Sequence, residues 1–333
     1  MSVKVAINGF GRIGRNILRS AVENGRNDIK IVAVNDLASI ETNVHLLKYD
    51  SIHGRFPRQI LIHGDTIGIG DSLIRVTNLK NPEELPWGEV DIVLECTGSF
   101  TSKELASIHL KSGARRVLVS APSNGADKTI AYGVNHNILE PNDIIVSNAS
   151  CTTNCLAPVA KVLDETVGIK KGFMTTIHSY TGDQPTLDRD HNDLYRARAA
   201  ALNMVPTSTG AARAVGMVLP KLEGKLDGVA MRVPTPNVSC VDLTFESARD
   251  TTAEEINNAM HAAANGSLAG ILGVVDEKLV SMDFNHDSRS SIFATDQTRV
   301  IDSNFCRILT WYDNEWGFST RMLDTAAAMG KLI

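Results

Sequence analysis

Short apolar runs alternate with helix-like segments through the first 150 residues of the chain. Residues 3–8 and 31–35 are typical of strands, and between them residues 12–24 carry apolar side chains at helical spacing. This order predicts a βαβ unit with parallel strands. Further apolar runs predict strands at 91–96, 116–120 and 144–147. The pattern therefore predicts a doubly wound parallel sheet, in which ligands bind beyond the carboxyl ends of the strands.

Polar residues follow these predicted strands. Because the carboxyl ends of parallel strands share one edge of the sheet, these residues are expected near one cleft: Asn8, Asp36, Thr97, Ser120 and Asn148.

The pattern changes after Cys151. A helix is predicted through about Val167, and longer alternating runs then predict a mostly antiparallel sheet in an α+β domain, at residues 173–180, 228–233 and 239–245. The polar, Arg-rich residues 181–203 form a long connection, of a kind that is often functional or in contact with another subunit. We predict a first domain at residues 1–150, completed by a C-terminal helix at 315–333, and a catalytic domain at 151–314.

Composition narrows the possible partners. The 333 residues carry a net charge of −5 without a dense basic run, so nucleic acid is not expected as a partner. No stretch approaches ~18 apolar residues and the start lacks the apolar region of a signal peptide, which predicts no membrane association and a cytoplasmic location. Five cysteines are an odd number, which fits a reducing compartment. Cys151 and Cys155 lack a second pair at zinc spacing, so no metal site is expected.

A glycine-rich segment, Gly9-Phe10-Gly11-Arg12-Ile13-Gly14, follows the first strand and opens a helix. In this context the motif predicts a Rossmann-type dinucleotide site, with the pyrophosphate at the helix N-terminus. Asp36 ends the second strand, where it could bind ribose hydroxyls and repel a 2′-phosphate, which favours NAD over NADP. Packing glycines and a capping Asp36 are the alternative interpretation.

Cys151 lies where a strand gives way to a helix. A thiolate at a helix N-terminus is stabilised by the helix dipole and free N–H groups, so Cys151 is a candidate nucleophile. A small buried cysteine is the alternative, and the neighbouring Ser150, Thr152 and Thr153 could cap the helix or bind an anion.

The nine residues from Ser147 to Cys155, Ser-Asn-Ala-Ser-Cys-Thr-Thr-Asn-Cys, closely resemble the active-site signature of the phosphorylating glyceraldehyde-3-phosphate dehydrogenase family. The resemblance runs the length of the chain. It includes residues 6–15 (AINGFGRIGR), 178–181 (HSYT), 206–212 (PTSTGAA), 232–237 (RVPTPN) and 311–317 (WYDNEWG).

This resemblance implies oxidation of D-glyceraldehyde 3-phosphate to 1,3-bisphosphoglycerate with NAD, in glycolysis or gluconeogenesis, by a cytoplasmic homotetramer. Cys151 would form a hemithioacetal and then a thioester, and His178 would activate the thiol as a thiolate–imidazolium pair and transfer protons. Cofactor contacts are expected from Gly9, Gly11, Arg12, Ile13, Gly14, Asp36, Lys80, Ser120 and Asn314. The substrate phosphate would meet Thr181, Asp183 and Arg232, and the attacking inorganic phosphate would meet Ser150, Thr152, Arg196, Thr209 and Gly210.

Three alternatives remain at this point. Arg189-Asp190 stands where many NAD-specific relatives have Leu-Pro, so Arg189 could meet a 2′-phosphate on a neighbouring subunit's cofactor. Erythrose-4-phosphate dehydrogenase shares the Cys151 segment, although residues 179–183 and 206–210 keep the form typical of the triose-phosphate enzymes. A non-catalytic, NAD-binding redox sensor would use Cys151 as a peroxide-sensitive thiol, but it would need neither His178 nor two phosphate sites.

Overall fold

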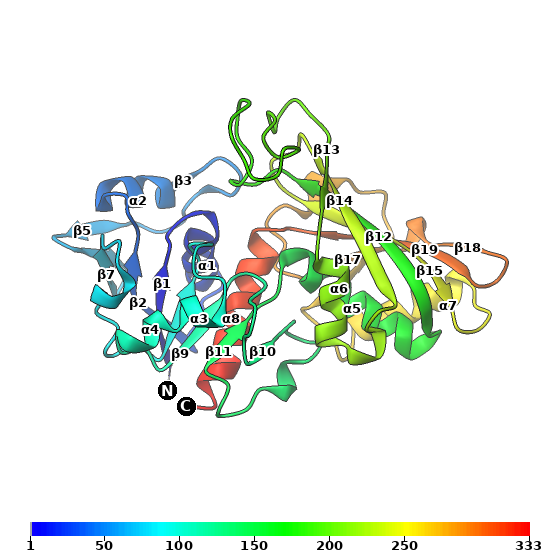
Figure 1. Ribbon diagram of the computed structural model, residues 1–333, viewed down its shortest axis with the longest axis horizontal. Coiled ribbons are helices and arrows are strands. Elements are labelled where there is room, and N and C mark those ends of the chain that lie inside the picture. The colour runs from blue at the N-terminus through cyan, green and yellow to red at the C-terminus, as the bar shows by residue number, and fades with distance from the viewer. Residues whose placement is uncertain (1) are drawn as a thin grey trace. The chain divides into compact units, whose positions relative to one another are not determined.

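The computed structural model describes residues 2–333, and these form two compact units (Figure 1). Unit 1 contains the residues up to Tyr132, then His136–Ala149 and Ser319–Ile333. Unit 2 contains Gly133–Asn135 and Ser150–Phe318. The chain thus leaves unit 1 just before Cys151 and returns to it within its last helix.

Unit 1 is built on a nine-stranded sheet with the order β10-β11-β9-β8-β1-β2-β7-β6-β5. The strands from β10 to β7 are parallel, while β5, β6 and β7 are joined by antiparallel pairs. The order reverses between β1 and β8, which is the topological switch point of a Rossmann-type sheet. The bounds are β1 Val3–Asn8, β2 Ile29–Asn35, β5 Leu61–His63, β6 Thr66–Ile69, β7 Ser72–Thr77, β8 Ile92–Glu95, β9 Arg116–Val119, β10 Lys128–Thr129 and β11 Ile145–Ser147.

Helices and short connecting elements complete unit 1. They are α1 Arg12–Glu23, α2 Ile40–Lys48, α3 Lys103–Ala106, α4 Ile108–Lys111, the small β3 Tyr49–Asp50 and β4 Gly54–Arg55, and the 3-10 turns Pro82–Glu84 and His136–Ile138.

The C-terminal helix α8 (Trp316–Gly330) runs beside the strands and α1 of unit 1, as Figure 1 shows in red against blue and cyan. Its buried side chains include Met322, Leu323 and Met329. The Arg116 guanidinium donates from Nη1 to the Met329 carbonyl over 2.9 Å, which ties the end of this helix to β9.

Unit 2 is built on an eight-stranded sheet with the order β13-β14-β12-β15-β19-β17-β16, and β18 pairs with β19. Most pairs are antiparallel, but β12 with β14 and β16 with β17 are parallel. The bounds are β12 Ile169–Ser179, β13 Val205–Ser208, β14 Leu226–Val233, β15 Ser239–Ser247, β16 Leu272–Val275, β17 Ser291–Ala294, β18 Arg299–Ile301 and β19 Phe305–Tyr312.

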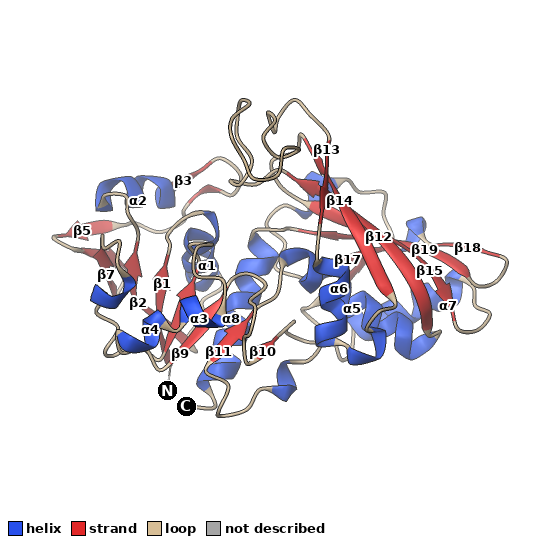
Figure 2. Cartoon of the chain, viewed as in Figure 1, coloured by secondary structure: helices blue, strands red, loops and turns tan. Residues whose placement is uncertain are grey.

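Three helices lie on one side of this sheet (Figure 2), namely α5 Cys151–Thr166, α6 Ala211–Val218 and α7 Ala253–Ala264. Short 3-10 turns lie at Pro220–Leu222, Ser281–Phe284 and Thr295–Gln297. Helix α5 is almost entirely buried along the face that packs on the sheet, and its residues include Leu156, Val159 and Leu163. This packing holds the first turn of α5, with Cys151, against the strands.

The predicted fold class is confirmed: a Rossmann-type parallel sheet in one unit and a largely antiparallel sheet in the other. Two details differ from the sequence pattern. The antiparallel strands at 61–77 were not predicted. They are short and partly exposed, so apolar and polar residues do not alternate clearly along them. The predicted strand at 228–233 begins earlier, at Leu226, and runs parallel to β12, an orientation that alternation alone does not reveal.

Candidate functional site

The glycine-rich turn of unit 1 joins β1 to α1. Gly9 has φ +91°, and a Cβ there would lie 2.6 Å from the Thr97 backbone nitrogen. A Cβ at Gly14 would lie 2.2 Å from the Gly9 carbonyl oxygen. A Cβ at Gly11, in contrast, would meet no atom within 4 Å. Two of the glycines are therefore required by the fold itself, whereas Gly11 leaves open the space that a phosphate would approach.

This difference predicts opposite outcomes for two alanine variants. Gly14→Ala should lower the free energy of unfolding by about 1–3 kcal/mol, because its methyl group overlaps a backbone carbonyl. Gly11→Ala should leave the free energy of unfolding within about 0.5 kcal/mol of the wild-type value and raise the Kd for NAD about tenfold. Urea unfolding and calorimetric titration with NAD measure both quantities. Unchanged NAD affinity in Gly11→Ala would contradict a phosphate position over this glycine.

A cavity of about 510 Å³ lies at the carboxyl ends of β1, β2 and β8. Its lining includes Asn8, Gly9, Gly11, Asp36, Lys80 and Thr97. Asp36 accepts hydrogen bonds from the Phe10 N–H at 2.8 Å and from the Ala38 N–H at 2.9 Å. These bonds fix the carboxylate at the glycine turn, and its remaining lone pairs can accept from ribose hydroxyls.

Other residues that were predicted for this site lie outside the lining of the cavity. The Arg12 guanidinium pairs with Asp50 at 2.5 Å, and Gly14 packs against the turn. Ser120 hydrogen-bonds to Cys96. Asn148 is buried and does not line the cavity, and its Oδ1 accepts from Thr325 at 2.7 Å. Ile13 is half-buried in the first turn of α1 and does not line the cavity.

In unit 2, Cys151 and His178 lie together. Ser150 caps helix α5 by accepting from the Thr153 N–H at 3.0 Å, and Cys151 is the first helical residue. The Cys151 Sγ lies 3.5 Å from the His178 Nε2. The His178 Nδ1 lies 2.7 Å from the Ser179 carbonyl oxygen, which can only accept, so Nδ1 carries the proton. In the neutral ring, Nε2 is therefore the free base that faces the thiol.

Burial controls the charge of this pair. Removal from water raises the pKa of Cys151, although Arg232 acts in the opposite direction. Removal from water, together with Arg232, lowers the pKa of His178 to about 3. Burial thus disfavours charge on either group taken alone. The thiolate–imidazolium pair that the resemblance implies stays a prediction.

The lowered pKa of His178 predicts a loss of stability in acid. The unfolded chain takes up a proton near pH 6.5 and the folded chain only near pH 3, so the unfolded state binds more protons between these values. Through this group the free energy of unfolding should be about 2 kcal/mol smaller at pH 5 than at pH 7. Urea unfolding at both pH values, with His178→Asn as the comparison, measures it. An equal pH dependence in both proteins would contradict a neutral, buried His178.

Two arginines lie near this pair. The Arg232 Nη1 donates to the Thr181 Oγ1 at 3.0 Å, and its buried Nε finds no hydrogen-bond partner among residues 2–333. Arg196 donates to the Asp183 carboxylate at 2.9 Å and to the Thr207 Oγ1 at 3.0 Å. Burial and then repulsion by Arg196 lower the pKa of Arg232. An anion placed between these groups would relieve both the repulsion and the unpaired N–H.

The other predicted phosphate ligands occupy helix starts. Gly210 precedes the first residue of α6, and the Thr209 Oγ1 accepts from the Ala211 N–H at 3.2 Å. Thr152 follows Cys151 but is buried, and its Oγ1 lies 2.8 Å from the Tyr312 hydroxyl. That hydroxyl also contacts Thr176 at 2.9 Å, so Tyr312 anchors the first turn of α5 to β12.

Asn314 is held through its carbonyl oxygen. The Oδ1 accepts from the Ser179 Oγ at 2.8 Å and from the Ser239 Oγ at 2.9 Å, which leaves the amide nitrogen pointing away from both serines. Sequence reasoning did not single out Tyr312, Ser179 or Ser239 as supports of the site. Their partners are distant in sequence, and no local spacing reports such contacts.

Among residues 2–333, no group of three or more His, Cys, Asp or Glu side chains could hold a metal ion. No helix in the same range is long and apolar enough to cross a membrane.

The fold and the cavity of unit 1 define the class of dinucleotide-dependent oxidoreductases. Family models described as "Glyceraldehyde 3-phosphate dehydrogenase, NAD binding domain" and "C-terminal domain" match residues 3–103 and 150–314. The chain belongs to the glyceraldehyde-3-phosphate dehydrogenase family, and its cofactor is NAD.

Relatives that carry the name glyceraldehyde-3-phosphate dehydrogenase match the chain from end to end. Those from Cereibacter sphaeroides and Xanthobacter flavus are 66% and 65% identical, with 100% of both chains covered. That from Geobacillus stearothermophilus is 54% identical, with 98% of both chains covered. The resemblance inferred from the sequence motifs is thereby confirmed.

Proposed function

We propose that the protein catalyses the phosphorylating oxidation of D-glyceraldehyde 3-phosphate to 1,3-bisphosphoglycerate, with Cys151 as the nucleophile and His178 as the base. The observation that carries this proposal is the 3.5 Å contact between Sγ and an Nε2 whose ring is fixed by the Ser179 carbonyl. A nucleophile and a base at this separation, with the base oriented by a third group, form a catalytic unit.

The steps follow from this arrangement. The His178 Nε2 takes the thiol proton as Sγ attacks the aldehyde carbon, and it then gives that proton to the carbonyl oxygen, which leaves a neutral His178 and a hemithioacetal with a new C–S bond. His178 then accepts the hemithioacetal hydroxyl proton while hydride leaves the same carbon; NAD, when bound, accepts that hydride. The resulting thioester is attacked by inorganic phosphate. The C–S bond breaks, and the acyl phosphate is released with Cys151 regenerated.

Two phosphate groups require two anion sites. We assign the substrate phosphate to Arg232, Thr181 and Asp183, since the Arg232 guanidinium and the Thr181 hydroxyl are already hydrogen-bonded to each other. The attacking phosphate is assigned to the N-termini of α5 and α6 and to the Arg196 guanidinium. The residues assigned to it are Ser150, Thr152, Arg196, Thr209 and Gly210. Helix N-termini and guanidinium groups both favour such anions.

The cofactor is assigned to the cavity of unit 1, with Asp36 at a ribose and Lys80 at its rim. The same Asp36 carboxylate would repel a 2′-phosphate, which supports a preference for NAD over NADP. Asn314 is assigned to the nicotinamide carboxamide, because its amide nitrogen is left available by the two serines. Arg12, Ile13, Gly14 and Ser120 do not line the cavity, and their contacts with the cofactor stay predictions.

We further propose a cytoplasmic homotetramer. The connection at 181–203 and the residue after it expose large apolar side chains, namely Leu187, Leu194, Tyr195, Leu202 and Met204. Exposed apolar patches of this kind mark interaction surfaces. The site serves glycolysis or gluconeogenesis according to the metabolite concentrations.

The proposal is tested by the rate of NADH formation with glyceraldehyde 3-phosphate, with and without inorganic phosphate. Fast reduction of NAD that depends on phosphate is the expected result. Erythrose 4-phosphate and NADP serve as controls, and each should support a much lower kcat/KM. A higher kcat/KM with erythrose 4-phosphate, or turnover that ignores phosphate, would contradict the proposal.

A further inference from the structure

A second cavity lies within unit 1, at the amino end of β2. It has a volume of about 270 Å³ and is lined by the second half of α1 and the residues after it, the start of β2, Arg58 and the β6–β7 hairpin. It shares no lining residue with the cofactor cavity, which lies at the carboxyl end of β2. The two cavities are therefore separate sites.

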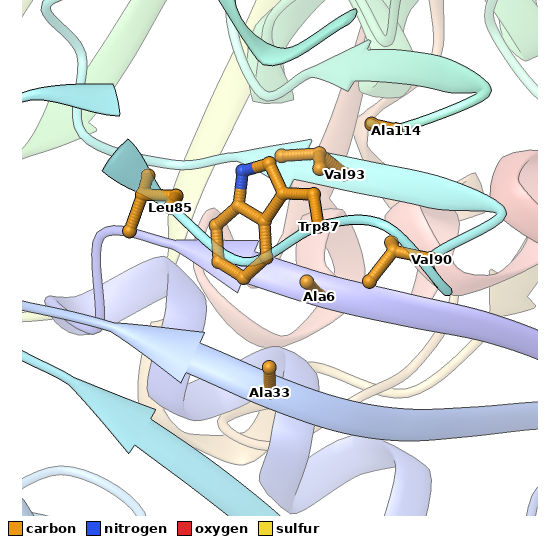
Figure 3. Close-up of a cluster of buried hydrophobic side chains, with 7 residues drawn as sticks. All are labelled: Ala6, Ala33, Leu85, Trp87, Val90, Val93 and Ala114. Atoms are coloured by element: carbon orange, nitrogen blue, oxygen red, sulfur yellow. The ribbon is translucent and has the colours of Figure 1, made fainter. Parts of the chain in front are cut away.

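The cavity lies where β2 and β7 cease to pair. Their parallel register joins Ala33–Asn35 to Arg75–Thr77 and does not extend to the earlier residues of either strand. Ala33 belongs to the buried cluster around Trp87, which Figure 3 shows and which fixes β2 at the point where pairing begins. Before this point, residues from both strands line the cavity instead of bonding to each other.

Aliphatic side chains form the walls of this second cavity. Leu18, Ile31, Ile69 and Ile74 all line it, and each is at most 6% exposed. They come from α1, β2, β6 and β7, so the apolar surface is held by four elements of the fold. Small-molecule sites are typically apolar hollows of this kind with a few polar groups at fixed positions.

The charged side chains that line the cavity are all cations, namely Arg26, Lys30 and Arg58. Arg26 is neutralised by its neighbours, since its guanidinium pairs with Asp28 at 2.8 Å and with Asp324 at 2.6 Å. Arg26 therefore closes one side of the cavity without attracting a further anion.

Lys30 and Arg58 are different. Both are exposed, and among residues 2–333 neither pairs with an acidic side chain. Asp71 follows the lining residue Gly70 but is exposed and does not itself line the cavity. The cavity thus combines apolar walls with two cations that lack a counter-ion.

We propose that this cavity binds a small organic monoanion, an aryl or alkyl carboxylate or sulfonate, with its apolar body against the aliphatic walls and its acid group at Lys30 and Arg58. A guanidinium and an ammonium group both favour such an acid group. An inorganic anion would leave the walls in water, and a neutral apolar molecule would leave both cations without a partner. The proposal is independent of the proposed activity, because the two cavities share no residue.

The test uses two fluorescent probes, the anion anilinonaphthalene sulfonate and its neutral counterpart phenylnaphthylamine. Each is titrated into the purified protein in the presence of excess NAD, which keeps the cofactor cavity occupied. The double variant Lys30→Gln with Arg58→Gln should raise the Kd of the anionic probe about tenfold, because each exposed charge pair contributes about threefold. The Kd of the neutral probe should change less than about twofold.

The matched control is the double variant Arg75→Gln with Lys111→Gln. It makes the same change in net charge within unit 1, but both residues pair with acidic side chains and neither lines the cavity. Its Kd for the anionic probe should stay within about 1.5-fold of the wild-type value. A tenfold rise in this control as well would show a general effect of net charge and overturn the proposal.

Ser72→Phe tests the position of the site. Ser72 is an exposed strand residue that lines the cavity, and its hydroxyl makes no hydrogen bond among residues 2–333. An aromatic residue suits a strand, so the variant should keep its urea midpoint while its ring fills the cavity and removes the binding of both probes. Unchanged binding in this variant, or complete displacement of the anionic probe by NAD from the wild-type protein, would place the probe elsewhere and overturn the proposal.

Discussion

Replacing Cys151 with serine should lower the rate of NADH formation on the order of 10³-fold or more while NAD still binds with a Kd within about twofold of the wild-type value. The serine hydroxyl is far less acidic than the thiol, so its proton is much harder for His178 to remove, and a hydroxyl is a weaker nucleophile than a thiolate. The cofactor cavity lies wholly within unit 1, so its glycine turn and Asp36 are untouched. Steady-state kinetics and NAD titration measure the two effects separately.

Cys306→Ser is the matched control for this experiment. The Cys306 Sγ is buried and donates to the Asn304 carbonyl at 3.6 Å, a bond that a serine hydroxyl can also make. Its activity should stay within about twofold of the wild-type activity. Substantial turnover in Cys151→Ser would exclude the thioester mechanism.

Replacing His178 with asparagine should lower kcat by about 10²–10⁴-fold, the usual contribution of a positioned general base. The asparagine amide can still reach the Ser179 carbonyl, but it offers no titratable nitrogen to the Cys151 thiol. The rate of Cys151 alkylation by iodoacetamide at neutral pH should fall as well, because no base then faces the sulfur.

His261→Asn is the control for His178. This residue is partly exposed on α7, and among residues 2–333 its side chain pairs with Asp276 alone, at 3.1 Å, so its replacement should leave kcat within about twofold. A fall in kcat for His178→Asn with an unchanged alkylation rate would mean that His178 acts only in the hydride-transfer step. That result would contradict its role as the base that takes the thiol proton.

The first unit was largely predictable from the sequence because its signals are local. The glycine turn, the apolar strands and the helical period of α1 each lie within a dozen residues. The position of Cys151 at a helix start was equally readable, since Ser150 is a typical N-cap.

The contacts that set the chemistry were not predictable in this way. The contacts of the Tyr312 hydroxyl with Thr152 and Thr176 depend on which strands become neighbours. The pairing of β12 with β15, and of β15 with β19, brings residues 130 or more positions apart into one layer. Burial then shifts the pKa values of the pair, and burial is a property of the folded chain.

Residue identity alone also does not give the partners of two polar side chains. Arg12, expected at the cofactor, pairs with Asp50, and the Asn148 Oδ1 accepts from Thr325. Each of these partners lies far along the sequence.

The central claim is that the oxidised substrate is held on Cys151 as a thioester until phosphate removes it. Mixing the protein with excess NAD and glyceraldehyde 3-phosphate in the absence of phosphate should give a burst of NADH equal to one equivalent per Cys151, with the mass increase of a phosphoglyceryl group on the peptide that contains Cys151. Added phosphate should release the group and restore turnover. No burst, or a burst with the mass increase on another residue, would contradict the account.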